Sequence, residues 1–149
     1  PVIVQKLADY GIAATHRCLP GDDRAAITRA AMDFRAAGCD LILCTGGMSV
    51  DPDDNTPGAI KASGARIVTY GAPVLPGAMF LLAYTEAGIP IMGLPGCVMY
   101  ARRTIFDLIL PRVLAEDEIT PKDLARYGEG GLCLNCEVCT FPKCGFGKC

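Results

Sequence analysis

The residue types best suited to chemistry in this sequence are cysteines that crowd near its end, and glycines and aspartates that gather in three loops. Of the nine cysteines, five lie within the last seventeen residues. Thiolates two residues apart can reach one metal ion from a single turn of backbone, so this spacing predicts a metal site. The expected ligands are Cys133, Cys136, Cys139 and Cys144, with Cys149 as the expected spare.

Three kinds of chemistry fit these C-terminal cysteines. A structural zinc site uses four cysteines in a tetrahedron. An iron–sulfur cluster also uses four, and the leading Cys-x2-Cys-x2-Cys spacing resembles a ferredoxin run, although the next gap has four residues instead of three. Disulfides are the third kind, and a reducing compartment argues against them. The four cysteines elsewhere in the chain are expected to be reduced core thiols.

The second group of candidate residues lies in three glycine-containing loops, each of which follows an apolar stretch. Gly46 and Gly47 lack a Cβ atom, so a ligand can approach their backbone closely. Their N–H groups, with the hydroxyls of Thr45 and Ser49, can bind phosphate or carbonyl oxygens. Pro95-Gly96 precedes an expected long helix, whose N-terminus would favour an anion. The three loops are 19–23, 44–49 and 94–97.

Aspartates accompany the glycines and would repel an anionic ligand unless a cation lay between them. Carboxylate oxygens suit Mg²⁺, so the pattern predicts a magnesium ion between the protein and a phosphate. The alternative is that the glycines only make tight turns and the aspartates only cap helices. The glycines do not form a Walker loop, because no Gly-Lys-Ser/Thr follows them. The aspartates are Asp22, Asp51, Asp53 and Asp54.

The elements that must position these loops alternate between helices and short apolar strands. Such alternation predicts an α/β fold with a mostly parallel sheet and helices on both faces. Because the first element is a helix, which normally follows a strand, we expect at least one strand to lie upstream and the domain to be N-terminally incomplete. Helices are expected at 2–10, 22–38, 56–63, 79–86 and 98–114, and strands at 12–18, 41–44, 66–70 and 89–94.

Size and composition limit the classes of protein that the chain can represent. It has 149 residues, of which 51% are hydrophobic, and a net charge of −2, which suits one ordinary folded domain. There is no basic excess, so we expect no nucleic-acid or anionic-membrane partner. No apolar run reaches the roughly 18 residues of a membrane span, and no signal peptide is expected, so we expect a cytoplasmic protein. The expected domain covers 1–116, and a linker and cysteine-rich tail cover 117–149.

The order of the loops carries a family resemblance. The stretch Leu-Ile-Leu-Cys-Thr-Gly-Gly-Met-Ser at 41–49, followed by Asp54-Asn55-Thr56-Pro57, resembles the molybdopterin-binding domain of molybdenum-cofactor biosynthesis proteins. That family includes molybdopterin adenylyltransferases and molybdotransferases. Pro-Gly-Asp-Asp at 20–23, Pro-Val-Leu-Pro-Gly at 73–77 and Leu-Pro-Gly at 94–96 resemble its further segments in the same order. The resemblance covers residues 1–115.

This resemblance implies a fold, a ligand and roles for individual residues. The implied fold is a three-layer α/β/α sandwich that often assembles as a trimer, so a homotrimer or homodimer is expected. Asp54 and Asp22 would be the catalytic residues near the phosphate and its metal. The residues implied to bind molybdopterin are Thr45, Gly46, Gly47, Met48, Ser49, Pro95 and Gly96.

Two hypotheses on function follow, because the sequence departs from both enzyme branches. Cys97-Val98 stands where molybdotransferases usually have Asn-Pro, and Met48-Ser49 stands where adenylyltransferases usually have Thr-Gly. These departures favour a domain that binds molybdopterin without turnover. The matching Asp54 and Asp22 favour the alternative, which is catalytic transfer of adenylyl or molybdenum to molybdopterin. An unrelated α/β domain without a pterin site is a third possibility.

Overall fold

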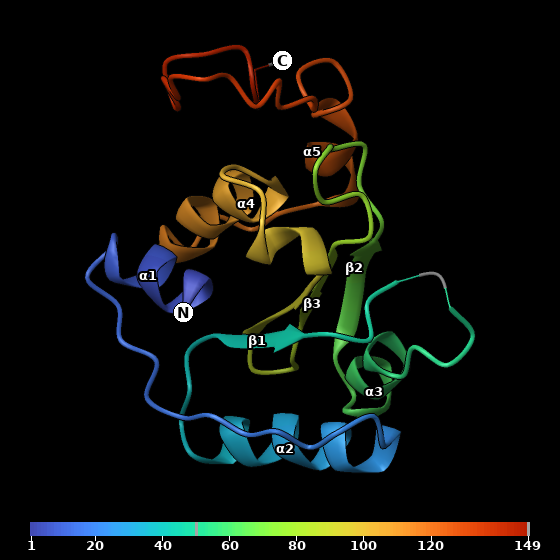
Figure 1. Ribbon diagram of the computed structural model, residues 1–149. Coiled ribbons are helices and arrows are strands. Elements are labelled where there is room, and N and C mark those ends of the chain that lie inside the picture. The colour runs from blue at the N-terminus through green and yellow to red at the C-terminus, as the bar shows by residue number, and fades with distance from the viewer. Residues whose placement is uncertain (50, 149) are drawn as a thin grey trace.

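The computed structural model describes residues 1–49 and 51–148, which form five α-helices, one 3₁₀ helix and four strands (Figure 1). Helices and strands occur along the same chain and pack together, so the predicted α/β class is confirmed. The elements are α1 (Val2–Ala8), α2 (Arg24–Ala36), β1 (Ile42–Thr45), α3 (Thr56–Ala62), β2 (Arg66–Tyr70), β3 (Leu81–Tyr84), β4 (Pro90–Leu94), η1 (Gly96–Met99), α4 (Ile105–Leu114) and α5 (Pro121–Arg126).

The four described strands form one mixed sheet in the order β1-β4-β3-β2. β1 and β4 are parallel, whereas β3 is antiparallel to both of its neighbours. The expectation of a mostly parallel sheet is therefore wrong for the described strands. The cause is a short turn in which the Thr85 amide donates to the Ile89 carbonyl. A connection this short joins β3 to β4 as a hairpin, and hairpin strands must run antiparallel.

The strand β3 replaces the helix that was expected at 79–86. Phe80, Leu81, Leu82 and Ala83 are all fully buried, because both faces of the sheet are covered. A short apolar run of this kind has no alternation of polar and apolar residues, so its pattern does not separate a helix from a buried strand. The expected helix was wrong for this reason.

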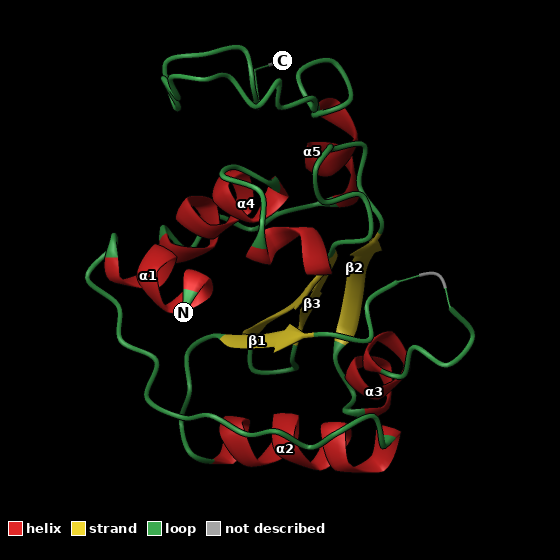
Figure 2. Ribbon diagram, viewed as in Figure 1, coloured by secondary structure: helices red, strands yellow, loops and turns green. Residues whose placement is uncertain are grey.

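Helices cover both faces of the sheet, which agrees with the expected three-layer sandwich (Figure 2). Leu81 and Ala83 belong to an apolar core shared with Ile60 of α3 and Phe34 of α2. Leu82, between them on β3, belongs to a larger core with the helix α4 and with α1. Neighbouring strand residues point to opposite faces, so the alternation along β3 shows that the sheet separates two cores.

The long helix expected at 98–114 is broken into η1 and α4. Thr104 has an extended backbone and caps α4, whose Asp107 accepts a hydrogen bond from the Thr104 amide at 2.8 Å. This reciprocal capping box gives α4 its own start, separate from η1. At the N-terminus of α2, Asp23 accepts a hydrogen bond from the amide of Ala26.

The segment expected as a strand at 12–18 forms no strand or helix. A strand needs a partner for its backbone N–H and C=O groups, and the apolar pattern cannot supply one. The outer edge of β1 also has no neighbouring strand in the described residues. The expected additional strand upstream of the chain stays a prediction.

The residues after α4 pack against the main domain. Thr120 and Asp123 form a capping box for α5, a helix that the sequence analysis did not include. Leu75 pairs with Leu132 in an isolated parallel bridge, and Phe146 is buried in the larger core. No helix among the described residues has the length and apolar character to cross a membrane.

Candidate functional site

Two of the predicted loops leave the sheet at the same edge. β1 and β4 run parallel, with Thr45 directly opposite Leu94. The 46–49 loop and the Pro95-Gly96 turn therefore start side by side at the carboxyl ends of neighbouring strands, where α/β proteins commonly bind ligands. The 19–23 loop approaches through Asn55, whose Nδ2 donates to the carbonyl oxygen of Asp22 at 2.9 Å.

The two glycines of the first loop have backbone conformations that favour glycine. Gly46 has φ +85° and Gly47 has φ +57°, both in the left-handed region. A Cβ atom on Gly47 would lie 2.9 Å from Oγ1 of Thr56, and that hydroxyl donates to the Gly46 carbonyl at 2.8 Å. The loop is thus tied to the start of α3, and its close approach depends on glycine at 47.

Met48 anchors this loop by its side chain. It is 2% exposed, and a Cβ atom on Gly93 of β4 would lie 2.5 Å from Met48 Cε. The thioether therefore fills the space that Gly93 leaves, and only the backbone of Met48 remains for a ligand. Thr45, Gly46 and Ser49 are exposed. The Ser49 carbonyl accepts a hydrogen bond from the Tyr70 hydroxyl at 3.0 Å.

Asp54 differs from the other aspartates of these loops. Its Oδ2 atom is buried and has no hydrogen-bond partner among the described residues, whereas Asp22, Asp51 and Asp53 are exposed. Burial, and secondly the charge of Asp54, raise the pKa of Tyr70. Within residues 1–49 and 51–148, no three His, Cys, Asp or Glu side chains are grouped to hold a metal ion. The magnesium site stays a prediction. In the described residues, Oδ2 of Asp54 is the one buried carboxylate oxygen of these loops that lacks a hydrogen-bond partner.

The long helix predicted to start at Pro95-Gly96 is wrong, and the binding role of these two residues stays a prediction. Pro95 is buried and Gly96 is exposed, but together they lead into η1, which has only four residues. The helix α4 begins at Ile105, and its first amides are capped by Thr104 and Asp107. The Pro95-Gly96 turn can therefore offer its exposed backbone to a ligand, without the dipole of a long helix.

The family of the chain follows from comparison with known proteins. Residues 1–115 match the family described as a probable molybdopterin binding domain. The chain belongs to this family. The match includes all three loops and ends before the cysteine-rich tail. No curated protein matches the chain.

Three residues that support the loops of this molybdopterin-binding domain were missed in the sequence. Gly93 receives Met48, Thr56 holds the Gly46 carbonyl, and Tyr70 holds the Ser49 carbonyl. An isolated glycine inside a strand indicates close approach of another group, so the sequence contained a signal for Gly93. Thr56 stands in the Asp-Asn-Thr-Pro segment that carries the family resemblance, but its contact with Gly46 was not visible in the sequence. Tyr70 had no signal, because it acts through a contact distant in sequence.

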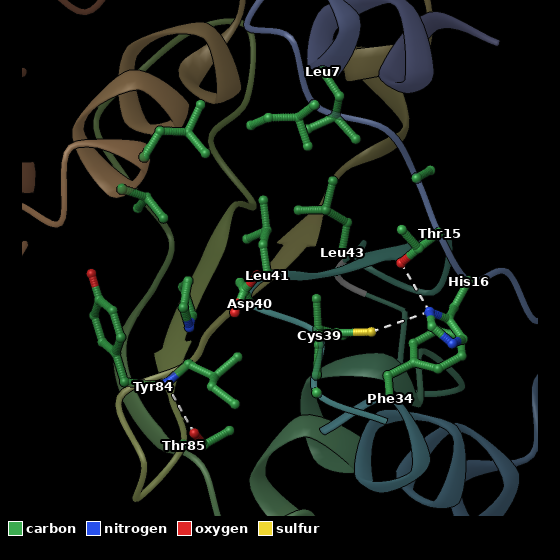
Figure 3. A pocket seen from close by; sticks show the side chains of 18 of the residues that line it. Leu7, Thr15, His16, Phe34, Cys39, Asp40, Leu41, Leu43, Tyr84 and Thr85 are labelled. Atoms are coloured by element: carbon green, nitrogen blue, oxygen red, sulfur yellow. Dashed lines mark hydrogen bonds between the residues drawn. The ribbon is translucent and has the colours of Figure 1, made fainter. Parts of the chain in front are cut away.

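A large cavity lies beside these loops and not at them. It has a volume of about 1640 Å³ and follows the outer edge of β1, between that strand, α1 and residues 12–17. Figure 3 shows His16 at one end, where its Nδ1 lies 2.9 Å from Thr15 Oγ1 and 3.5 Å from Cys39 Sγ. Thr45 is the one member of the predicted pterin-binding set among its lining residues.

The cysteines outside the tail differ in environment. Cys44 lies on β1, and burial raises the pKa of its thiol from 9.0 to about 11. Burial also raises the pKa of Cys97. Cys18 is exposed, so its expected place in the core is wrong. All eight described cysteines, four of them in the tail, are free thiols.

We expect Cys44 to react slowly with iodoacetamide at pH 8. Its thiolate is the reactive form, and a pKa of about 11 instead of 9.0 lowers the thiolate fraction about 100-fold at that pH. Peptide mass spectrometry after timed alkylation measures this rate, with the exposed Cys18 as internal control. Equal rates for Cys44 and Cys18 in the folded protein would contradict the prediction.

Proposed function

We propose that this chain binds molybdopterin where β1 and β4 end, and that it acts in the synthesis or handling of the molybdenum cofactor. The observation that carries the proposal is the parallel register of Thr45 with Leu94. This register starts the 46–49 loop and the Pro95-Gly96 turn at one edge of the sheet. The family match over residues 1–115 supports the pterin as the ligand.

The loop chemistry suits a flat polar ligand with an anionic end. In this proposal, the N–H groups of Gly46 and Gly47 and the hydroxyls of Thr45 and Ser49 bind the phosphate. Gly96 forms the facing wall, where a Cβ atom would meet no atom within 4 Å. The open space at Gly96 leaves room for a ring beside the backbone.

Catalytic transfer to molybdopterin is the second candidate function, and one observation favours it. Asp54 keeps a buried carboxylate oxygen without a partner among the described residues. Such an oxygen is a suitable ligand for Mg²⁺, which prefers carboxylates together with substrate phosphates. Asp54, with Asp22 from the neighbouring loop, would hold the ion, and the bound ion would neutralise phosphate charge.

A direct test combines binding with turnover. Molybdopterin is titrated into the purified chain under anaerobic conditions and followed by pterin fluorescence, and AMP transfer from MgATP is then assayed. Saturable binding supports the proposal, and AMP transfer adds the catalytic function. Binding without AMP transfer selects the binding-only function over adenylyl transfer. Absence of binding by the folded chain refutes both.

We expect Asp54→Asn to lower any Mg²⁺-dependent transfer by about 100-fold or more, since a metal ion supplies several kcal/mol of charge stabilisation. Asp53→Asn is the matched control, because Asp53 is exposed, lies in the same loop and loses the same charge. Steady-state rates of the two variants are compared at saturating Mg²⁺. Equal rates for both variants would remove Asp54 from the catalytic role.

A further inference from the structure

A separate small cavity lies in the cysteine-rich tail, at its contact with the start of α4. Its volume is about 110 Å³, several times the roughly 30 Å³ that one water molecule occupies in the liquid. Two arginines and the aromatic rings of Phe141 and Phe146 form part of its wall. The four tail cysteines that line it are Cys133, Cys136, Cys139 and Cys144.

The tail backbone is fixed to the domain on both sides of this cavity. The Leu75 amide donates to the Gly131 carbonyl at 2.7 Å, and the Cys133 amide donates to the Leu75 carbonyl at 2.8 Å. At the far end, Phe146 is buried in the larger core. The four cysteines thus lie between two attachments of the tail to the domain. In Figure 1 the tail lies above α4 and α5.

Two positive charges adjoin the cysteines. Arg102 Nη1 donates to the carbonyl oxygens of Cys136 and Glu137, both at 3.3 Å. The Arg103 guanidinium lies 4.8 Å from the centroid of the Phe141 ring, and its Nε is buried without a hydrogen-bond partner in the described part of the chain. Arg103 therefore has an unused donor at the cavity wall.

The two guanidinium groups suit a metal centre that is surrounded by anionic thiolates. They would repel a metal cation that had no thiolate ligands. Four thiolates around one divalent ion, or around an iron–sulfur cluster, keep a net negative charge, which two nearby guanidinium groups would balance. Arg103 shares part of its charge with Asp107, to which it donates at 2.9 Å. Arg102 has no acidic partner among the described residues within salt-bridge distance.

We propose that Cys133, Cys136, Cys139 and Cys144 together bind one thiophilic metal centre, a zinc ion or an iron–sulfur cluster, in this cavity. The described side chains are not yet grouped for coordination, so binding must draw the thiols inward. The exposed stretch 134–140 lies between the two attachments and has no helix or strand to resist this movement. Metal binding and local folding are commonly coupled in this way.

The experiment uses the whole chain, purified anaerobically, then reconstituted in parallel with Zn²⁺ alone or with iron and sulfide. Elemental analysis, acid-labile sulfide and visible absorption distinguish the two centres. We expect about one centre per chain. Zinc without sulfide assigns a zinc site, whereas iron with matching sulfide and cluster absorption assigns the cluster. Either result supports the proposal, and no stoichiometric metal in either arm overturns it.

Cys136→Ser and Cys18→Ser form a matched pair, since each removes one exposed thiol. We expect Cys136→Ser to lose most of the bound metal and Cys18→Ser to keep it. Unchanged metal content in Cys136→Ser overturns the four-cysteine assignment. If Cys136→Ser misfolds, thiol counting on the wild-type chain decides: the metal should protect four thiols from a thiol reagent. Unprotected tail thiols in the metal-loaded chain also overturn the proposal.

Discussion

Replacing Gly93 with alanine is expected to weaken molybdopterin binding at least about tenfold, although Gly93 lies inside β4. The added Cβ would lie 2.5 Å from Met48 Cε and 2.6 Å from Met48 Sδ, and 3.2 Å from Leu81 Cβ. Met48 is the flexible partner, so it must leave its slot and move the loop that carries it. Overpacking of this kind costs about 1–3 kcal/mol of folding free energy. Pterin fluorescence and urea denaturation measure the two effects.

Matched variants separate this mechanism from general damage. In Gly93→Ala/Met48→Ala the shorter side chain makes room for the new methyl group, so the stability losses should be less than additive. Met48→Ala alone is expected to cost about 2–5 kcal/mol, as buried truncations do. Gly96→Ala should leave stability unchanged, because its Cβ would meet no atom within 4 Å. Strict additivity of the Gly93 and Met48 effects would show that the two residues do not share this space.

Replacing Asp107 with alanine is expected to lower the free energy of unfolding by about 3–5 kcal/mol, because it leaves a largely buried charge without its partner. Asp107 is 6% exposed, and the side chain of Lys6 is 12% exposed. The carboxylate accepts from Lys6 Nζ at 2.6 Å and from Arg103 Nη1 at 2.9 Å. It also completes the cap of α4 with Thr104, so one substitution removes both the ion pair to α1 and the cap of α4.

The control for Asp107→Ala is Asp117→Ala. Asp117 makes an ion pair with Arg112 at 2.7 Å, but its side chain is 48% exposed, so its loss should cost about 1 kcal/mol or less. Lys6→Met in the Asp107→Ala background removes the unpaired charge and should recover part of the stability. Urea denaturation of the variants provides the comparison. An effect of Asp107→Ala as small as that of Asp117→Ala would refute the buried-charge explanation.

Much of the architecture could be read from periodicity. The helix at 24–36 has an apolar stripe, and the strands at 42–45 and 90–94 are continuous apolar runs, so their types were predicted correctly. The order of these elements also located two loops at one sheet edge, as the pairing of Thr45 with Leu94 shows. Local patterns were sufficient here because the residues of each segment were enough to determine whether it forms a helix or a strand.

The errors arose where contacts outside the apolar pattern decide the structure. The strand β3 is buried by helices on both sides, so its own residues carried no period. The break before α4 depends on the side chains of Thr104 and Asp107, which override an apolar pattern that continues through it. Residues 12–18 have a strand-like composition, but a strand also requires a neighbouring strand to pair with, and composition does not show whether one is present.

In the candidate site, too, some features could be predicted from the sequence and others depended on contacts in the folded chain. Glycines, aspartates and loop positions were visible in the sequence, whereas the anchoring of Met48 against Gly93 and the buried oxygen of Asp54 needed coordinates. The roles of these residues in ligand binding and catalysis stay predictions. So do the domain boundary near 116, the cytoplasmic location and the assembly of the chain as a trimer or dimer.

The division of the interior by the sheet has a consequence for motion. Met48 belongs to the smaller core, with Ile60 of α3 and Ile91 of β4, whereas α4 and Phe146 belong to the larger one. Regions with fewer buried apolar contacts open at lower free energy than the rest of a protein. We therefore expect the α2–α3 layer, which has the smaller core, to open at lower free energy than the α4 side. Such a partial opening would release the loop beside β1 and leave the cysteines at the opposite end undisturbed.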